Sequence, residues 1–237
     1  MNSLQVIQQR GLSQACRKIC RRVQAIAWVC GIGLCISSAV AQTESDVRDM
    51  IHQIDQLRDA GKFQEAVPIA EKVLKYCEQH DGPDHPETAD SLNDLASLYA
   101  GMGNYSKAVP LYERALKIRE KALGKEHPYT AIILNNLAET YRESGDFAKA
   151  EPLYKRAIKI FEAKLGRTHP NTVGVTANLA LLYEAKGDAA KAEPLYTRVL
   201  KIREETLGPD DPQVANTLSG LAALYYRQGN YAKAEPM

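Results

Sequence analysis

The sequence predicts an all-α protein, an α-solenoid in which antiparallel pairs of helices are stacked along the chain. The first observation is a tandem repeat. Glycine and alanine each recur at one fixed interval, which equals the distance along the sequence from residue 61 to residue 103. The second is that apolar residues inside a repeat follow the i, i+3, i+4, i+7 spacing of one helix face. Such repeats are typical of folds in which each unit buries its apolar face against its neighbours. The recurring positions are Gly61, Gly103, Gly145, Gly187 and Gly229, with Ala66, Ala108, Ala150, Ala192 and Ala234.

The overall composition is that of a globular protein. The 237 residues include 30 Lys+Arg, 29 Asp+Glu and 45% apolar residues, which is too apolar for a disordered tail. A net charge of +1 and a pI near 7.6 argue against a nucleic-acid-binding protein, which usually has a strong basic excess. The charge is unevenly distributed, however. Segment 1–41 holds five of the basic residues and none of the acidic ones, so the rest of the chain is acidic, with a formal charge of −4.

Residues 1–41 are predicted to be a signal peptide. A basic n-region (1–22) precedes an uncharged apolar h-region (23–41) that ends in the small residues Ala39-Val40-Ala41. The protein is therefore expected to be exported, periplasmic or secreted, after cleavage before Gln42. One alternative is a membrane anchor, because segment 23–41 is just long enough to span a bilayer. An organelle presequence is a further alternative.

Cleavage would leave Cys77 as the single cysteine, so the mature chain could form no internal disulfide. A metal site with His80 and His85 is conceivable. A half-buried helix cysteine is favoured instead, because no second cysteine completes a ligand set. The sequence therefore predicts neither a metal site nor a cofactor.

The repeats follow in order along the chain. Residues 42–84 are predicted to form a degenerate first helix pair, in which Gln53 and Leu57 replace a leucine and a tyrosine. A more polar terminal unit suits an array, because its outer face meets water. Segments 103–124 and 145–166 are identical at 13 of 22 positions. The complete repeats are 85–126, 127–168 and 169–210, and 211–237 is a truncated repeat.

Each repeat predicts two helices. The first helix begins at the proline of a His-Pro or Asp-Pro pair, since proline suits the first helical turn. In the repeat from 127, Leu134, Leu137 and Ala138 lie on its apolar stripe, and Gly145 follows its end. Asp146 is the expected N-cap of the second helix. Equivalent caps are Asn104, Asp188 and Asn230.

Proline recurs inside the second helices, where it removes a backbone hydrogen bond and should cost about 3 kcal/mol or cause a bend. The positions are Pro110, Pro152, Pro194 and Pro236. Their recurrence suggests that the stacked geometry uses a bend there.

The pattern Leu-x-x-Leu-Ala-x-x-Tyr, followed after three residues by Gly-Asn/Asp-Tyr/Phe-x-x-Ala, resembles the tetratricopeptide repeat. The segment from Ala150 to Ala157 and the Leu-Gly-x-x-His-Pro motif are similar to the kinesin-light-chain-type variant. The resemblance covers residues 46–237 and implies a right-handed superhelix of antiparallel helix pairs. A role in kinesin transport is not expected, because no heptad coiled coil precedes the repeats and an export signal does.

No motif in the sequence predicts catalysis, so the chain is not expected to be an enzyme. It has no glycine-rich phosphate loop, no metal-ligand cluster and no nucleophile motif. His85, His127 and His169 lie one repeat apart, about 10 Å, which is too far for a shared metal. They are interpreted as helix-start residues. Packing roles are predicted for Tyr99, Tyr141, Tyr183 and Tyr225, and structural roles for Asn136 and Asn178.

The resemblance implies that a peptide binds along the concave face formed by the first helices. The expected contacts are Asp90, Asn93, Ser97, Asn135, Glu139, Arg142, Leu181, Glu184, Asn216 and Arg227. Asparagine amides can pair with an extended backbone, Arg142 with a carboxylate and Leu181 with an apolar side chain. The alternative for each of these residues is ordinary polar surface.

The predicted function is therefore a non-catalytic, exported scaffold that binds a protein or peptide partner of unknown identity. No nucleic-acid partner is expected, and membrane contact is expected only through an uncleaved N-terminal segment. The sequence stops inside a second helix, which predicts that Leu218, Leu221, Leu224 and Tyr225 lack their covering helix. We thus expect a fragment of a longer chain, or an end covered by a partner or a second copy. The alternative functions are a regulatory or docking segment of an enzyme whose catalytic domain lies beyond residue 237, and end-to-end self-association.

Overall fold

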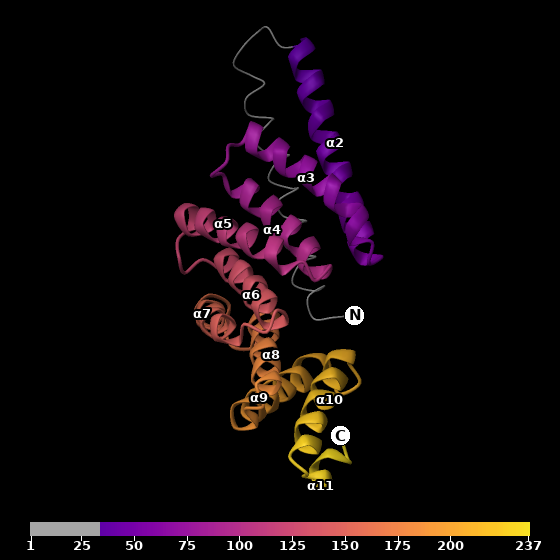
Figure 1. Ribbon diagram of the computed structural model, residues 1–237, viewed down its shortest axis with the longest axis vertical. Coiled ribbons are helices and arrows are strands. Elements are labelled where there is room, and N and C mark those ends of the chain that lie inside the picture. Colours follow the sequence, from indigo (N-terminus) through magenta and orange to yellow (C-terminus); the bar gives the residue numbers. More distant parts are fainter. Residues whose placement is uncertain (1–33) are drawn as a thin grey trace. The chain divides into compact units, whose positions relative to one another are not determined.

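The computed structural model describes residues 34–237, which form helices joined by short loops (Figure 1). The all-α prediction is confirmed, and no strand occurs in this part of the chain. The chain divides into two compact units, unit 1 (Met1–Ala122) and unit 2 (Leu123–Met237). The helices in order are α2 (Leu34–Asp59), α3 (Phe63–His80), α4 (Pro86–Gly101), α5 (Tyr105–Leu123), α6 (Pro128–Glu143), α7 (Phe147–Leu165), α8 (Pro170–Ala185), α9 (Ala189–Leu207), α10 (Pro212–Arg227) and α11 (Tyr231–Ala234).

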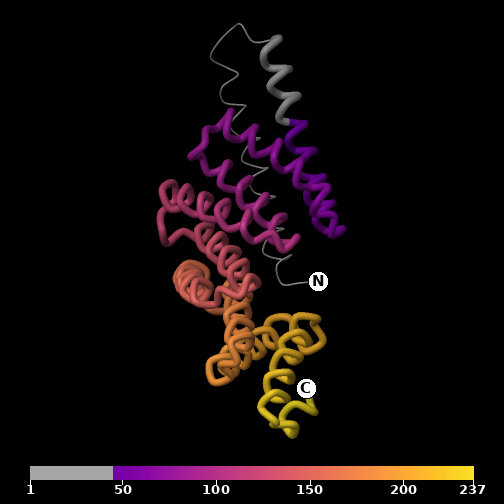
Figure 2. The backbone as a smooth tube through the Cα atoms, in the orientation of Figure 1, coloured from indigo at the N-terminus to yellow at the C-terminus, as the bar shows by residue number. Residues whose placement is uncertain are grey.

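The helices pack in sequence order within each unit, as the tube in Figure 2 shows. In unit 1, α3 packs against both α2 and α4. In unit 2, each helix from α7 to α11 packs against the helix before it, and α8 also contacts α6 and α10. The first helices of unit 2, α6, α8 and α10, are therefore direct neighbours.

Most of the predicted signal segment lies outside the described residues. The exception is 34–41, which belongs to the first part of α2. Within residues 34–237, none of the helices combines the length and the apolar character needed to cross a membrane.

Three of the first helices are each capped by a histidine. The prediction that these histidines are helix-start residues is thus confirmed. Nδ1 of His85, His127 and His169 accepts the backbone N–H two residues later, at 3.2 Å in each case. Asp211 accepts the N–H of Gln213 in the same way, at 2.7 Å. Proline then occupies the first turn. Backbone N–H groups there have no carbonyl partner within the helix, so the missing N–H of proline costs no hydrogen bond.

A threonine then ties each of the same three helices to the loop before it. The hydroxyl groups of Thr88, Thr130 and Thr172 donate to the carbonyls of Gly82, Gly124 and Gly166, at 2.7, 2.9 and 2.8 Å. All three threonines are fully buried. The glycines have φ of 102°, 92° and 92°, a left-handed conformation that other residues rarely adopt. We call this threonine–glycine hydrogen bond the loop lock.

The second helices begin with less uniform caps than expected. Asp146 and Asp188 accept the backbone N–H of Lys149 and Lys191, at 3.2 and 3.3 Å, as predicted. Asn230 stands at the cap position of α11 but makes no capping bond with its side chain. The Asn104 side chain accepts the hydroxyl of Ser106, at 3.0 Å.

The second helices α3, α5, α7 and α9 continue through Pro68, Pro110, Pro152 and Pro194. Each proline costs one backbone bond but does not end its helix. Pro236 differs, because α11 ends at Ala234. The expectation of a proline inside the last second helix is therefore wrong.

The recurring alanines of the second helices belong to the core. Ala66, Ala108, Ala150 and Ala192 are fully buried. Tyr141, Tyr183 and Tyr225 are buried as predicted, whereas Tyr99 is half-buried. Three of these tyrosines have a glutamate partner on the preceding second helix: Tyr99 with Glu71, Tyr183 with Glu151 and Tyr225 with Glu193, at 3.0, 2.9 and 2.7 Å.

The expectation of an uncovered stripe at the end of unit 2 is wrong. Leu221, Leu224 and Tyr225 are buried and Leu218 is half-buried, because α9 and α11 pack against α10. The exposed apolar residues there are instead Tyr226, which is 65% exposed, and Tyr231. Their rings lie edge to face, with centroids 5.2 Å apart.

The loop lock can be tested by replacing Thr172 with valine. We expect Thr172→Val to lower the free energy of unfolding by about 1 kcal/mol, because valine keeps the shape but cannot donate to the Gly166 carbonyl. Urea unfolding followed by circular dichroism measures this change. Thr197→Val is the matched control, since that exposed hydroxyl bonds only to Glu193 of its own helix. Equal losses in the two variants would contradict a role for the lock.

Candidate functional site

The predicted contact residues of unit 2 recur at the same repeat positions on neighbouring first helices. Glu139 of α6 and Leu181 of α8 lie exactly one repeat apart, and so do Arg142 and Glu184. Because α8 lies against both α6 and α10, these positions form adjacent rows. We call this surface the inner face of unit 2.

An arginine on α6 lies between two glutamates. Nη2 of Arg142 lies 3.3 Å from Glu143 and 3.8 Å from Glu139. The Glu139 side chain is only 12% exposed. Burial raises the pKa of Glu139 to about 7, the charge of Glu143 raises it further, and Arg142 opposes the rise. Glu139 is therefore a carboxyl group on this surface whose pKa lies close to neutral pH.

Glu184 connects α8 to both α9 and α10. Its carboxylate accepts hydrogen bonds from the Arg227 guanidinium of α10 and from the Tyr196 hydroxyl of α9. Burial and the adjacent carboxylate raise the pKa of Tyr196, so its hydroxyl remains a donor. Glu184 is mostly buried, whereas the Arg227 side chain is 56% exposed. Arg227 can therefore contact a partner while it is still paired.

An exposed leucine lies one turn before Glu184. Leu181 is 39% exposed, although the residues on both sides of it in α8 are buried. Asn216 on α10 is exposed as well. The inner face thus offers an apolar contact close to charged and amide groups.

Asn135 does not belong to this surface. It is 1% exposed, its Oδ1 accepts from Asn178 of α8 at 3.0 Å, and its amide donates to Asn136 at 3.3 Å. A side chain enclosed between α6 and α8 cannot contact a peptide, so its predicted binding role is replaced by a structural one. Asn136 and Asn178 are buried too, which agrees with their predicted structural roles.

The predicted residues of unit 1 lie on α4, and only Asp90 among them lines a cavity. Asp90 is paired with the Arg119 guanidinium of α5, whose side chain is buried. Asn93 is half-buried, and its side chain hydrogen-bonds to Asp94. The Ser97 hydroxyl donates to the Asp94 carbonyl at 2.8 Å. Ser97 is thus occupied by its own helix.

A cavity of about 50 Å³ lies between α2, α3 and α4 of unit 1. Its apolar walls come mainly from α2 and α3, and its carboxylates from α2 and α4. Burial raises the pKa of Asp94 to about 7, and the charges of Asp90 and Asp55 add to the rise, while Arg58 and Asn93 oppose it. The lining residues are Val47, Ile51, Ile54, Asp55, Ala70, Val73, Tyr76, Cys77, Glu87, Asp90, Ser91 and Asp94.

Sequence reasoning identified neither Asp55 nor Asp94 as part of this site. Asp55 lies on α2, in the repeat with the weakest pattern, and its place beside α4 depends on how α2 packs. Asp94 follows Asn93 directly and could have been found by examining the neighbours of each predicted contact. In the described residues, no group of three or more His, Cys, Asp or Glu side chains is placed to hold a metal ion.

Comparison with known proteins identifies the repeat. The Tetratricopeptide repeat family matches residues 52–121, 95–163 and 165–237. No curated protein matches the chain.

Several solved structures share the fold. The putative kinesin light chain TPR-like repeats of Podosopora anserina are 28% identical, with a TM-score of 0.69 over 81% of this chain and 91% of that chain. BtubC (BKLC) from P. vanneervenii is 29% identical, with a TM-score of 0.71 over 84% and 81%. The apo form of RapI is 16% identical, with a TM-score of 0.67 over 80% and 66%, and shares the fold alone.

The titration of Glu139 gives a testable change in stability. Because folding raises the pKa of Glu139 from 4.5 to about 7, its stabilising contribution is present at low pH and is lost as pH rises through 7. We expect Glu139→Gln to match the wild type near pH 4 and to be more stable by roughly 1–3 kcal/mol near pH 8. Urea unfolding across this pH range measures the difference. The same gain for Glu126→Gln, at an exposed loop residue, would contradict the assignment.

Proposed function

Because the chain belongs to the tetratricopeptide repeat family, we propose that it is a non-catalytic scaffold that binds an extended segment of a partner protein along its first helices. The observation that carries the proposal is the inner face of unit 2. There, the exposed Leu181 lies one turn before Glu184 on α8, which contacts both α6, the helix of Arg142, and α10, the helix of Arg227.

The charged groups of the inner face are already held in place before a partner binds. Glu184 fixes the Arg227 guanidinium, and Glu139 and Glu143 lie beside Arg142. A partner therefore finds ordered side chains and spends less conformational entropy on binding. Leu181 can cover an apolar side chain, and the exposed part of the Arg227 guanidinium can donate to a carboxylate or a backbone carbonyl.

The binding surface can be tested with a random peptide library displayed on phage and selected against the protein. We expect Leu181→Asp and Arg227→Glu each to weaken the selected peptides by about tenfold, because the apolar contact is lost and the charge near Glu184 is reversed. Fluorescence anisotropy with labelled peptides measures the affinities.

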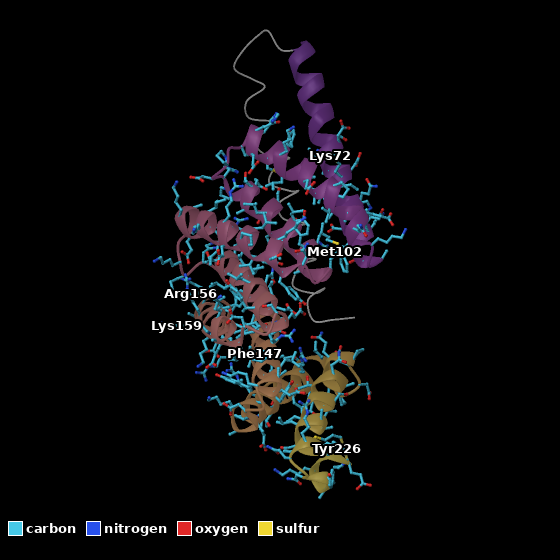
Figure 3. The ribbon with its side chains drawn as sticks, viewed as in Figure 1. Lys72, Met102, Phe147, Arg156, Lys159 and Tyr226 are labelled. Carbon is cyan, nitrogen blue, oxygen red and sulfur yellow. The ribbon has the colours of Figure 1, made fainter. Side chains whose placement is uncertain are left out.

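Lys159→Glu is the matched control for this test. It reverses a charge at an exposed position of the second helix α7 (labelled in Figure 3) and should leave the affinities unchanged. Selected peptides that tolerate both inner-face changes but lose affinity with Lys159→Glu would place binding on the second helices and contradict the proposal.

The scaffold is further proposed to act outside the cytoplasm, after cleavage of the N-terminal segment before Gln42. The support for this is the basic n-region and apolar h-region that end in Ala39-Val40-Ala41. We expect the mature protein to begin at Gln42. Mass spectrometry of the protein from its source cells measures this, and an intact Met1–Ala41 segment would contradict it.

A further inference from the structure

We propose that the cavity of unit 1 receives a lysine side chain of the bound partner. Its aliphatic stem would lie against the apolar walls from α2 and α3, and its ammonium group among the carboxylates of α2 and α4. This inference rests on the proposed scaffold function and names one chemical feature of the partner.

The shape of the cavity suits an unbranched aliphatic chain. Val47, Ile54, Ala70 and Val73 are all buried core residues that also line the cavity, so its inner surface is apolar. A volume of about 50 Å³ accommodates roughly three to five water-sized groups, at about 10–15 Å³ each. The lysine side chain beyond Cβ supplies four such groups, Cγ, Cδ, Cε and Nζ.

The charges around the cavity favour a cation. Four carboxylates line it, those of Asp55, Glu87, Asp90 and Asp94. Two arginines offset two of them, since Arg58 lies 2.5 Å from Asp55 and Arg119 pairs with Asp90. An apolar side chain would add nothing to offset the negative charge of the cavity, and an acidic one would be repelled. In a lysine side chain, the flexible aliphatic stem can pack against the apolar walls while the compact ammonium group lies near the carboxylates.

Asp94 is the carboxylate that we assign to the ammonium group. Burial and the charges of Asp90 and Asp55 disfavour its ionised form, while Arg58 and a hydrogen bond with the neutral Asn93 amide favour it. A cation in the cavity would reverse this balance and stabilise the ionised carboxylate. The other groups around Asp94 are Arg58 from α2, Tyr76 and Cys77 from α3, Glu87 from the start of α4, and Arg119 from α5, through its pair with Asp90.

The test uses two short peptides and the full chain. The probe is acetyl-Gly-Gly-Lys-Gly-Gly-amide, and its control carries norleucine, which has the same stem without the charge. We expect saturable amide shifts in α2, α3 and α4 by NMR with a millimolar dissociation constant, and binding of the norleucine peptide weaker by about tenfold. Equal binding of the two peptides would overturn the assignment of a cation.

Two variants locate the binding. Asp94→Asn removes the charge with little change in shape and should weaken the lysine peptide by about fivefold. Glu65→Gln removes an exposed charge of α3 outside the cavity and should have no effect. An unchanged affinity in Asp94→Asn, or an equal loss in Glu65→Gln, would overturn the role of the cavity.

The pH dependence gives a third readout. Because the lysine peptide selects ionised Asp94, whose pKa is about 7, its affinity should increase about threefold between about pH 6 and about pH 8. In Asp94→Asn this increase should disappear, even though other groups such as His80 and His85 are still present. An increase of the same size in the variant would overturn the proposal.

Failure of this inference can be told apart from failure of the proposed function. The lysine peptide tests the cavity without an identified partner, and the phage-selected peptides test the inner face of unit 2. If the selected peptides depend on Leu181 while the lysine peptide does not bind, the cavity assignment is wrong and the scaffold function stands. If the lysine peptide binds as expected and the selected peptides are unaffected at Leu181, the cavity assignment stands and the inner-face proposal is wrong.

Discussion

Within each unit the structure depends on one constraint, the fixed start of a first helix at the loop before it. A left-handed glycine turns the chain, the threonine hydroxyl of the loop lock holds the glycine carbonyl, and a histidine or aspartate accepts a free backbone N–H group of the new helix. Because these bonds recur, equivalent side chains reach the same position in successive repeats. The buried alanines, the tyrosine–glutamate pairs and the rows of the inner face all follow from this register.

The same register explains which parts of the structure could be predicted from the sequence. Helix starts depend on residues within one repeat, and their periodic positions predicted them. The periodic positions also predicted the buried tyrosines. Asn135 was misassigned because its burial depends on Asn178 of the next first helix, which no local pattern reports. The cavity could not be found for a similar reason, since its carboxylates come from α2 and α4, and Asp94 stands where the next two repeats have Asn136 and Asn178. The covered end of α10 depends on α11, a short helix (Tyr231–Ala234).

Different repeats use the same buried position differently. Arg119 and Arg203 lie two repeats apart, and both are buried on second helices. Arg119 is paired with the carboxylate of Asp90, whereas Arg203 donates to the carbonyl of Gln213 and the hydroxyl of Thr217, at 3.0 and 2.7 Å. Burial without a carboxylate partner lowers the pKa of Arg203, with Asp211 opposing the effect. Alanine and tyrosine therefore maintain the stack, while charged positions differ between units and give each one a distinct surface.

Cys77 gives unit 1 an intrinsic kinetic reporter. The thiol is buried in α3, accepts the Ser91 hydroxyl of α4 at 3.2 Å, and has a pKa raised by burial to about 11. Cys77 also lines the cavity of unit 1, so a small reagent can approach the thiol there, and reaction requires loss of the thiol proton because the thiolate is the nucleophile. The rate of alkylation at this residue therefore reports on access to the cavity, without an introduced label. Occupation of the cavity would cover the thiol and slow that rate.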